Sequence, residues 1–546
     1  MDTRRLILFV IFSFSTLMLW DAWQRQHTPP VVATQPTSDL PAIAGQPAKS
    51  GPTAPIDGTY VVAKAQRITV ETDLYSAEID TVGGDLRKLV LKQHRSAADI
   101  KQNYMLLDDS AKPMTYIAQS GFVGTDLPSH KTVYTAANSA YALKEGENQL
   151  EVRLTAFSNG VSVDKVYVFK RANYAIDVNF DIKNASANTL EPTVYYQIVH
   201  DNESNQGTKL MPSFTGGVYY SEASKFKKVS FKDMSKEKLA VNSNDGWVGL
   251  LQHYFVSAWI PKEGTPREYY STQLNDHLFA IGAKSALAAI PAGANVVVPA
   301  RIYSGPQTQK DLLATAPGLE YTVDYGWLTV IAKPLFWVLS KIHSLVQNWG
   351  VAIILLTVLL KALFYPLSAA SYRSMAHMRE VAPKLQAMKE KFGDDKQKMQ
   401  QAMIELYRTE KINPMGGCLP ILVQVPVFIA LYWTILGSIE LRHAPFFGWI
   451  HDLSAIDPYY ILPVLMGATM IIQTRLNTTP PDPIQAKVMK IMPVVFSVFF
   501  FFFPAGLVLY WLVNNVLSIA QQWYINKTIH AETLAKKGNL QQGNAK

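Results

Sequence analysis

A single lysine, Lys361, interrupts the apolar run from Val351 to Tyr365. The run is long enough to enter a bilayer, where an ammonium group costs roughly 2.5–3.5 kcal/mol. A chain that keeps such a charge usually supplies water or a polar partner for it. Thr357 lies one helical turn before Lys361, so its hydroxyl falls on the same helix face. The chemistry that this pattern predicts is electrostatic: a cation kept within a membrane segment to attract an acidic group.

Amide, hydroxyl and aromatic side chains gather in a later apolar segment, 504–523. Those that share one helix face are Trp511, Asn515, Ser518 and Gln522. Those on an adjacent stripe are Tyr510, Asn514 and Gln521. Such groups either hydrogen-bond to neighbouring helices, at roughly 0.6 kcal/mol per contact, or line a hydrated cavity. The number of amides on this one helix exceeds what packing needs, which favours a cavity.

The structural alternative for Lys361 is a side chain that extends to the membrane surface or forms a fixed ion pair. The apolar segments after residue 350 contain no Asp or Glu, so the sequence offers no buried partner there. Gln424, between two prolines, fits helix packing and cavity lining equally well. We therefore expect a hydrated cavity lined by Lys361, Thr357, Gln424, Tyr510, Trp511, Asn514, Asn515 and Ser518.

The composition indicates a membrane protein with a large water-exposed part. Of the 546 residues, 48% are hydrophobic and 17% are charged, whereas soluble proteins carry about 25% charged residues. The apolar residues cluster at the extreme N-terminus and after Val351. The one cysteine, Cys418, excludes an intrachain disulfide, a zinc cluster and a CxxC redox pair, and we expect it simply to pack. A water-exposed domain of this chain must be held together by core packing.

The N-terminal segment is predicted to be a membrane anchor followed by a linker. Arg4 and Arg5 precede an apolar stretch that lacks a small-x-small cleavage site. Residues 1–24 are therefore predicted to be an uncleaved signal anchor rather than a cleaved signal peptide. Residues 25–58 are rich in Pro, Ala, Thr and Ser, which predicts a flexible linker.

Residues 59–325 are predicted to form one β-rich domain. Apolar and polar residues alternate over 174–183, and 149–156 and 163–169 have similar patterns. Turn-forming residues at 184–188 follow the clearest of these strands. Short strands over this length predict a large antiparallel β-sandwich.

The C-terminal half alternates apolar and charged segments. Residues 326–350 have helical apolar spacing and tryptophans, which predicts an amphipathic interfacial helix that Pro334 kinks or divides. Transmembrane helices are predicted at 351–368, 416–437, 459–475, 486–503 and 504–523. The other segments are a helical hairpin at 369–415, loops at 438–458 and 476–485, and a basic tail at 524–546.

The basic residues predict the orientation of these helices. Lys and Arg are frequent in 369–415, in the stretch 475–490 and in the tail, whereas 438–458 has Arg442 as its one permanent base. The positive-inside rule places the first three in the cytoplasm and puts the β domain on the other side. With the anchor, the chain is predicted to have six transmembrane helices and two cytoplasmic termini. The methionine-bearing hairpin is either a solvated strut or a docking surface for a ribosome, targeting factor or nascent chain.

Two motifs resemble those of a known family. The stretch Asn413–Tyr432, NPMGGCLPILVQVPVFIALY, closely resembles the signature of the YidC/Oxa/Alb membrane-insertase family. Phe503–Trp511, FPAGLVLYW, with Asn514 and Asn515 after it, is similar to the last helix of that family. The hairpin and the order of elements resemble its Gram-negative YidC form, and the resemblance covers nearly the whole chain.

The resemblance implies a fold and an activity. It implies a five-helix core around a groove that opens to the cytoplasm and to lipid, with a periplasmic β-supersandwich domain. It also implies a bacterial inner-membrane protein that inserts and folds membrane proteins, alone or beside the Sec translocon. The expected partners are nascent membrane proteins, the Sec translocon, lipid, and a ribosome or targeting factor, but not DNA. The family usually has arginine where this chain aligns Lys361, so charge attraction is expected without the planar fork of arginine.

Two other classes of protein are compatible with parts of the sequence. A secondary transporter would have inverted repeats or acidic residues at the membrane midplane, and the sequence shows neither. A sugar-binding receptor would use the β domain, and deletion of that domain would abolish its function. The sequence has no P-loop, HExxH or GxSxG motif, so we expect no enzymatic reaction and no cofactor.

Overall fold

The structure is a computed structural model that describes residues 65–110, 115–123, 127–202, 207–208, 211–392, 395–410, 419–476 and 483–543. The described chain divides into two compact units, which meet in sequence between Val323 and Asp324. The predicted anchor at 1–24, the predicted linker at 25–58 and Cys418 lie outside the described residues. These three expectations therefore stay predictions.

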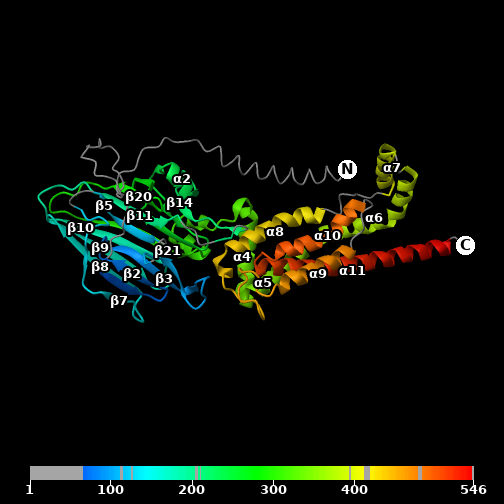
Figure 1. Cartoon of the computed structure of the whole chain (residues 1–546), viewed down its shortest axis with the longest axis horizontal. Helices are drawn as coiled ribbons and strands as arrows, with labels where there is room; N and C mark the ends of the chain where they lie inside the picture. The colour runs from blue at the N-terminus through cyan, green and yellow to red at the C-terminus, as the bar shows by residue number, and fades with distance from the viewer. Residues whose placement is uncertain are drawn as a thin grey trace. The chain divides into compact units, whose positions relative to one another are not determined.

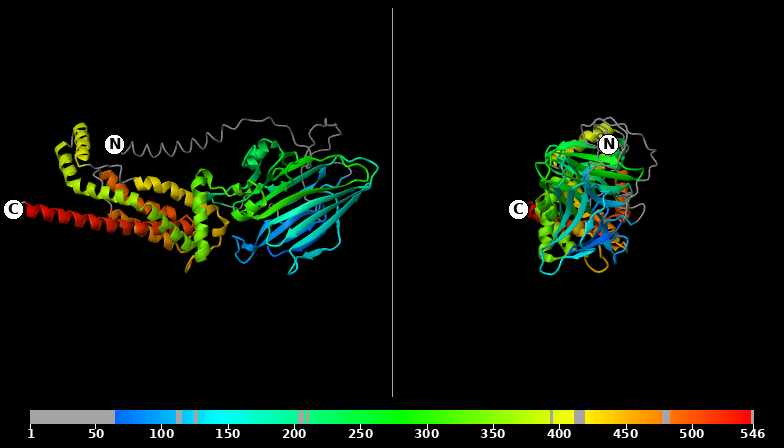
Figure 2. Two further views of the ribbon diagram at one scale, coloured as in Figure 1. Left: turned by 180° about the vertical axis from the view of Figure 1, so that it is seen from behind. Right: turned by 90° about the vertical axis from the view of Figure 1, so that its left-hand side faces the viewer.

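The first unit is a sandwich of two large sheets, in which antiparallel pairing dominates (Figures 1 and 2). The ten-stranded sheet has the order β16 (Ala240–Ser243), β19 (Arg267–Gln273), β20 (Leu278–Ala286), β11 (Thr193–Asp201), β5 (Tyr116–Val123), β3 (Asp85–Arg95), β2 (Tyr75–Asp80), β1 (Arg67–Glu71) and β7 (Ala140–Ala142), with β4 (Asn103–Leu107) paired to β3. The nine-stranded sheet has the order β15 (Lys227–Val229), β14 (Gly216–Tyr220), β17 (Trp247–Leu251), β18 (Phe255–Pro261), β21 (Asn295–Pro306), β10 (Ala175–Asn184), β9 (Val161–Lys170), β8 (Gln149–Ser158) and β6 (Thr135–Ala136). The smaller elements are β12 (Gly207–Thr208), β13 (Met211–Pro212), α2 (Phe231–Lys236), α3 (Gln309–Thr315) and the 3-10 turn η1 (Leu319–Thr322).

The alternating residues of β10 build the core between the sheets. Ile176, Val178 and Phe180 are fully buried, while the residues between them are half-exposed. The predicted strands at 149–156, 163–169 and 174–183 are confirmed as β8, β9 and β10. The predicted sandwich is confirmed as well, because each strand contributes one face to a shared apolar layer.

A chain of alternating charges passes through this apolar layer, and we call it the ion-pair chain. Lys165 and Asp85 are both fully buried and belong to different sheets, with Nζ and Oδ1 3.4 Å apart. The chain continues from Asp85 to Arg87 at 3.4 Å, and from Arg87 to Asp109 at 4.0 Å. It ends at Arg67, which contacts Asp109 at 2.6 Å and Asp80 at 3.2 Å. Burial lowers the pKa of Lys165 to about 8, although the attraction of Asp85 opposes that shift.

His200 is a buried neutral imidazole in β11. Its Nδ1 donates to the carbonyl oxygen of Asp201, and its Nε2 lies 3.3 Å from the Gln252 amide nitrogen, which donates to it. The ring stacks on Phe231 and meets Tyr116 edge-on. Burial lowers the pKa of His200 from 6.5 to about 4, because a charged ring would lose its hydration.

We expect acid to destabilise the β unit through His200. The unfolded chain binds a proton with a pKa near 6.5 and the folded chain with a pKa near 4, so the free energy of unfolding falls as pH decreases from 6.5 to 4. The full effect of this one group is roughly 3 kcal/mol. Denaturant titrations followed by tryptophan fluorescence at several pH values would measure it. His200→Asn retains a donor for Asp201 but cannot titrate, so an equally steep pH dependence in that variant would contradict the assignment.

The second unit is helical. Its elements are η2 (Gly326–Leu328), α4 (Thr329–Val346), α5 (Trp349–Leu363), α6 (Tyr365–Phe392), α7 (Lys396–Thr409), α8 (Leu419–Gly437), η3 (Ile439–Leu441), α9 (Ile461–Leu476), α10 (Pro483–Phe500) and α11 (Ala505–Gly543). Pro334 lies inside α4 without dividing it. Asn348 is the N-cap of α5, because its side chain accepts from the backbone N–H of Val351 at 3.0 Å.

The chain bends by 64° between α5 and α6, at Phe364. Pro366 explains the bend, because proline lacks an N–H group and its ring clashes with the carbonyl four residues earlier. The predicted transmembrane helix at 351–368 therefore consists of two helix segments. Among the described residues, α4 is the single helix that is long and apolar enough to cross a bilayer, and α5 together with the first part of α6 would be a second. The number of six transmembrane helices stays a prediction.

The segment between α8 and α9 is tied to the start of α11. The backbone N–H groups of Ala505 and Gly506 donate to the carbonyls of Ala455 and Leu453, at 2.7 and 2.9 Å. Asp457, which is 1% exposed, organises this segment. Its carboxylate accepts from Trp449 Nε1 and from two backbone N–H groups, those of Tyr459 at 3.0 Å and Leu462 at 2.7 Å. The Leu462 N–H belongs to the first turn of α9, where a carboxylate also stabilises the helix dipole.

Candidate functional site

Lys361 points from α5 towards α11 rather than along its own helix. Its Nζ donates to Ser518 Oγ at 2.7 Å. The Ser518 hydroxyl donates in turn to the carbonyl of Asn514, one helical turn earlier, also at 2.7 Å. Ser518 is 4% exposed, whereas Lys361 is half-buried. The ammonium group is thus held by an uncharged acceptor.

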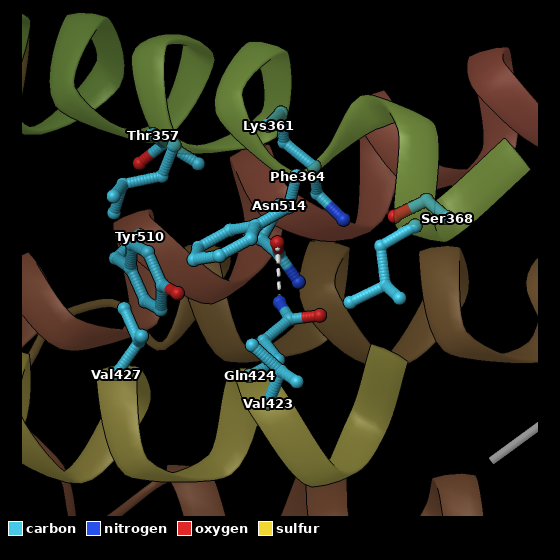
Figure 3. A pocket seen from close by; sticks show the side chains of 11 residues that line it. Thr357, Lys361, Phe364, Ser368, Val423, Gln424, Val427, Tyr510 and Asn514 are labelled. Carbon is cyan, nitrogen blue, oxygen red and sulfur yellow. Dashed lines mark hydrogen bonds between the residues drawn. The ribbon is translucent and has the colours of Figure 1, made fainter. Parts of the chain in front are cut away.

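A small cavity lies beside this contact (Figure 3). Gln424 of α8 crosses it and donates from Nε2 to Asn514 Oδ1 at 2.6 Å. The volume of this cavity is about 30 Å³, which is room for about one water molecule. The residues around it are Thr357, Leu360, Lys361, Phe364, Leu367, Ser368, Val423, Gln424, Val427, Tyr510 and Asn514.

A larger cavity of about 270 Å³ shares four of these residues, which are Lys361, Ser368, Gln424 and Asn514. The other side chains around it are Ser371, Tyr372, Met375, Val425, Phe428, Met470, Gln473, Trp511, Asn515 and Ser518. The described residues that line the two cavities include no Asp or Glu. The volume would hold on the order of nine waters at about 30 Å³ each. A polar space of this size can hydrate the Lys361 charge, and we call the two cavities together the groove.

The structure brings together all eight residues that the sequence predicted for the groove, since each lines one cavity or both. Their hydrogen bonds divide them by role. Thr357 donates to the carbonyl of Ile353 in its own helix at 2.7 Å, so its hydroxyl proton is occupied. Asn515 Nδ2 donates to Thr469 Oγ1 of α9 at 3.4 Å, which is a helix-packing contact. Trp511 meets Phe428 edge-on, and its buried Nε1 has no partner among the described residues.

Gln522 shares a helix face with Asn515 and Ser518, but it has a different neighbour. Its Nε2 donates to the carbonyl of Leu476, at the end of α9, at 3.3 Å. It lines neither cavity. For this residue the helix-packing alternative is the one that the structure supports.

Sequence reasoning missed several groove residues. Ser368 and Ser371, three residues apart at the start of α6, are both buried and face the larger cavity. Gln473 faces it from α9. A sequence signal was present, because Thr469 and Gln473 are separated by one helical turn within an apolar segment. The predicted boundaries place Ser368 at the end of a transmembrane helix and Ser371 in the cytoplasmic hairpin, whereas the chain bends at Phe364 and both lie in the first turns of α6.

The groove offers a cation, amides and hydroxyls to whatever enters it. No group of three or more His, Cys, Asp or Glu side chains that could hold a metal ion occurs in the part of the chain that the structure describes. The arrangement is suited to reversible binding of polar or acidic chain segments, because each contact is a hydrogen bond or a charge attraction.

The chain matches two family models and close relatives. Residues 67–338 match the model of the YidC periplasmic domain, and residues 341–532 match that of the 60Kd inner membrane protein. The chain is 61% identical to the membrane protein insertase YidC of Methylobacillus flagellatus, over 99% of this chain and 100% of that protein. It is 51% identical to the membrane protein insertase YidC of Aromatoleum aromaticum, over 98% of this chain and 100% of that protein. The chain also aligns with a crystal structure of an active YidC insertase in which the first transmembrane domain is resolved. This alignment covers 85% of this chain and 93% of that chain, with 20% sequence identity and a TM-score of 0.38.

Proposed function

The chain belongs to the YidC family of membrane protein insertases, and from that premise we propose that it inserts and folds integral membrane proteins in the bacterial inner membrane, alone or beside the Sec translocon. The observation that carries the mechanism is the half-buried Lys361 in a groove without a carboxylate among its described lining residues. An acidic residue in the translocated tail of a client would be attracted to that charge. The groove is thus a transient binding site for the polar part of a client.

The membrane around the groove would be locally thin. The helix α5 has 15 residues, so its length is about 22 Å at 1.5 Å per residue. A bilayer hydrocarbon core is about 30 Å thick, and a short helix is accommodated by local thinning. A polar tail would then cross a shorter apolar barrier, with groove water and side chains replacing part of its hydration. The apolar segment of the client would leave sideways into lipid, driven by the hydrophobic effect.

The orientation and partners are part of the same proposal. The β unit would be periplasmic, and six transmembrane helices would place both termini in the cytoplasm, as the loop charges indicate. The part of α6 beyond the groove would form the cytoplasmic hairpin together with α7, and Asp395 caps α7 by accepting from the Lys398 N–H at 3.1 Å. This hairpin and the end of α11 would contact a ribosome or targeting factor. The α4 helix would lie in the membrane interface.

Reconstitution tests the activity directly. The purified full-length chain in liposomes should insert a small single-span client, and protease protection of the translocated tail measures the yield. We expect protection well above that of empty liposomes, since the groove provides a polar route through the bilayer. Protection equal to that of empty liposomes, or of liposomes with an unrelated membrane protein, would contradict insertion by this chain alone.

A further inference from the structure

We propose that Ser518 is the positioning residue for the Lys361 ammonium group, and that this contact gives the groove its preference for clients with acidic translocated segments. The proposal rests on the proposed insertase function. Its basis is the 2.7 Å hydrogen bond from Lys361 Nζ on α5 to Ser518 Oγ on α11. The two residues are 157 positions apart in the sequence, so only the packing of α5 against α11 brings them together.

The direction of the hydrogen bonds makes Ser518 an acceptor for the lysine. A serine hydroxyl has one proton and two lone pairs. The Ser518 proton goes to the carbonyl of Asn514 at 2.7 Å, so the Ser518 oxygen accepts from Lys361 through a lone pair. The side chain of Asn514 is fixed in turn, because its Oδ1 accepts from Gln424 Nε2 at 2.6 Å. Ser518 is 4% exposed, so this acceptor is set in a packed helix surface rather than in open solvent.

An uncharged acceptor fixes the ammonium group without neutralising it. A carboxylate at the same position would form an ion pair and remove most of the field that an acidic client meets. A hydroxyl leaves the full positive charge of Lys361 directed into the groove. Two further Nζ protons remain for a client carboxylate or for water, because an ammonium group carries three donors.

Loss of the hydroxyl would release the lysine side chain. Lysine has a flexible four-carbon stem, which tends to extend towards the nearest aqueous surface. A client carboxylate would then meet a mobile cation, and the advantage of a prepositioned group would be lost. Client segments without an acid would be affected little, because their transfer depends on hydration of the groove rather than on the Lys361 charge.

The experiment compares variants of the full-length chain in liposomes with two clients that differ only by Asp→Asn in the translocated tail. The readout is the insertion rate of the Asp client divided by that of the Asn client. A general loss of stability would slow both clients alike and leave this ratio unchanged. Ser518→Ala should lower the ratio about tenfold, the size of one charge-assisted hydrogen bond. Ser518→Thr keeps a hydroxyl and should restore the ratio. Ser518→Asp should bring it close to one, because the new carboxylate pairs with Lys361.

A matched control is Ser497→Ala. Ser497 also forms a hydroxyl contact between helices, from α10 to the carbonyl of Pro463 at 3.2 Å, but it lies outside the groove lining. This variant should keep the wild-type ratio. The positioning role would be overturned if Ser518→Ala kept the wild-type ratio while Lys361→Ala brought the ratio close to one in the same assay. A wild-type ratio in Lys361→Ala as well would overturn the charged-groove mechanism and this proposal with it.

Discussion

Lys361→Ala should insert clients with acidic tails at least roughly 30-fold more slowly than the wild-type chain. Two charges about 4 Å apart attract by about 4 kcal/mol at an effective dielectric constant of 20. If half of that attraction lowers the activation free energy of the rate-limiting transfer step, the insertion rate rises by a factor of roughly 30. The half-buried position of Lys361 and the absence of carboxylates among the described lining residues mean that no fixed anion there weakens the effect. Insertion rates in liposomes, with the client in excess, would measure it.

Substitutions that keep or reverse the charge are the controls for Lys361. Lys361→Arg should retain function, because a guanidinium keeps the charge and can still donate to Ser518 Oγ. Lys361→Glu should be slower than Lys361→Ala with acidic clients, since a carboxylate repels them. Normal insertion of every client by Lys361→Ala would rule out a role for the charge.

Asp457→Ala should lower the free energy of unfolding of the helical unit by about 3–5 kcal/mol. The buried carboxylate accepts from the Trp449 indole and from the backbone N–H groups of Tyr459 and Leu462. Alanine would leave the buried Leu462 N–H without an acceptor, which costs about 1–3 kcal/mol, and the partly buried donors of Trp449 and Tyr459 would add smaller losses. The first turn of α9 would also lose its favourable charge. Thermal unfolding of the full-length chain in detergent, followed by near-ultraviolet circular dichroism, would measure the loss.

Asp452→Ala is the matched control in the same segment. Asp452 accepts from the N–H and hydroxyl of Ser454 and lies 3.6 Å from His443 Nδ1, and its side chain is 22% exposed. Solvent can replace those bonds, so we expect a change below about 1 kcal/mol. Equal destabilisation by Asp457→Ala and Asp452→Ala would show that the stability of the helical unit depends on the general packing of this segment and not on the buried carboxylate of Asp457.

Local periodicity predicted the features that depend on one element. The alternation over 174–183 predicted β10, because a strand buried on one face needs an apolar residue at every second position. Helical spacing predicted that Trp511, Asn515 and Ser518 lie on one face of α11, and all three line the larger cavity. The family motifs predicted the membership that the relatives confirm.

Features that depend on contacts between distant elements could not be predicted in the same way. Nothing local connects Lys361 to Ser518, and Asp457 was one acid among several in a loop until folding placed it against α9. Gln522 shares its face with groove residues, yet the end of α9 covers it. The bend at Phe364 had a local cause in Pro366, but the apolar residues that continue on both sides of it concealed it. Apolar length alone is therefore a poor guide to where a membrane helix ends.

The ion-pair chain of the β unit restricts how this domain can diverge. Removal of one partner from a buried pair costs about 3–5 kcal/mol, whereas replacement of a whole buried set by apolar residues is often neutral. Lys165, Asp85 and Arg87 are all at most 1% exposed, so each depends on its neighbour for compensation. Viable sequence drift at these positions should proceed by coordinated exchanges rather than single steps. A saturation library of the domain should accordingly tolerate few single replacements at these sites.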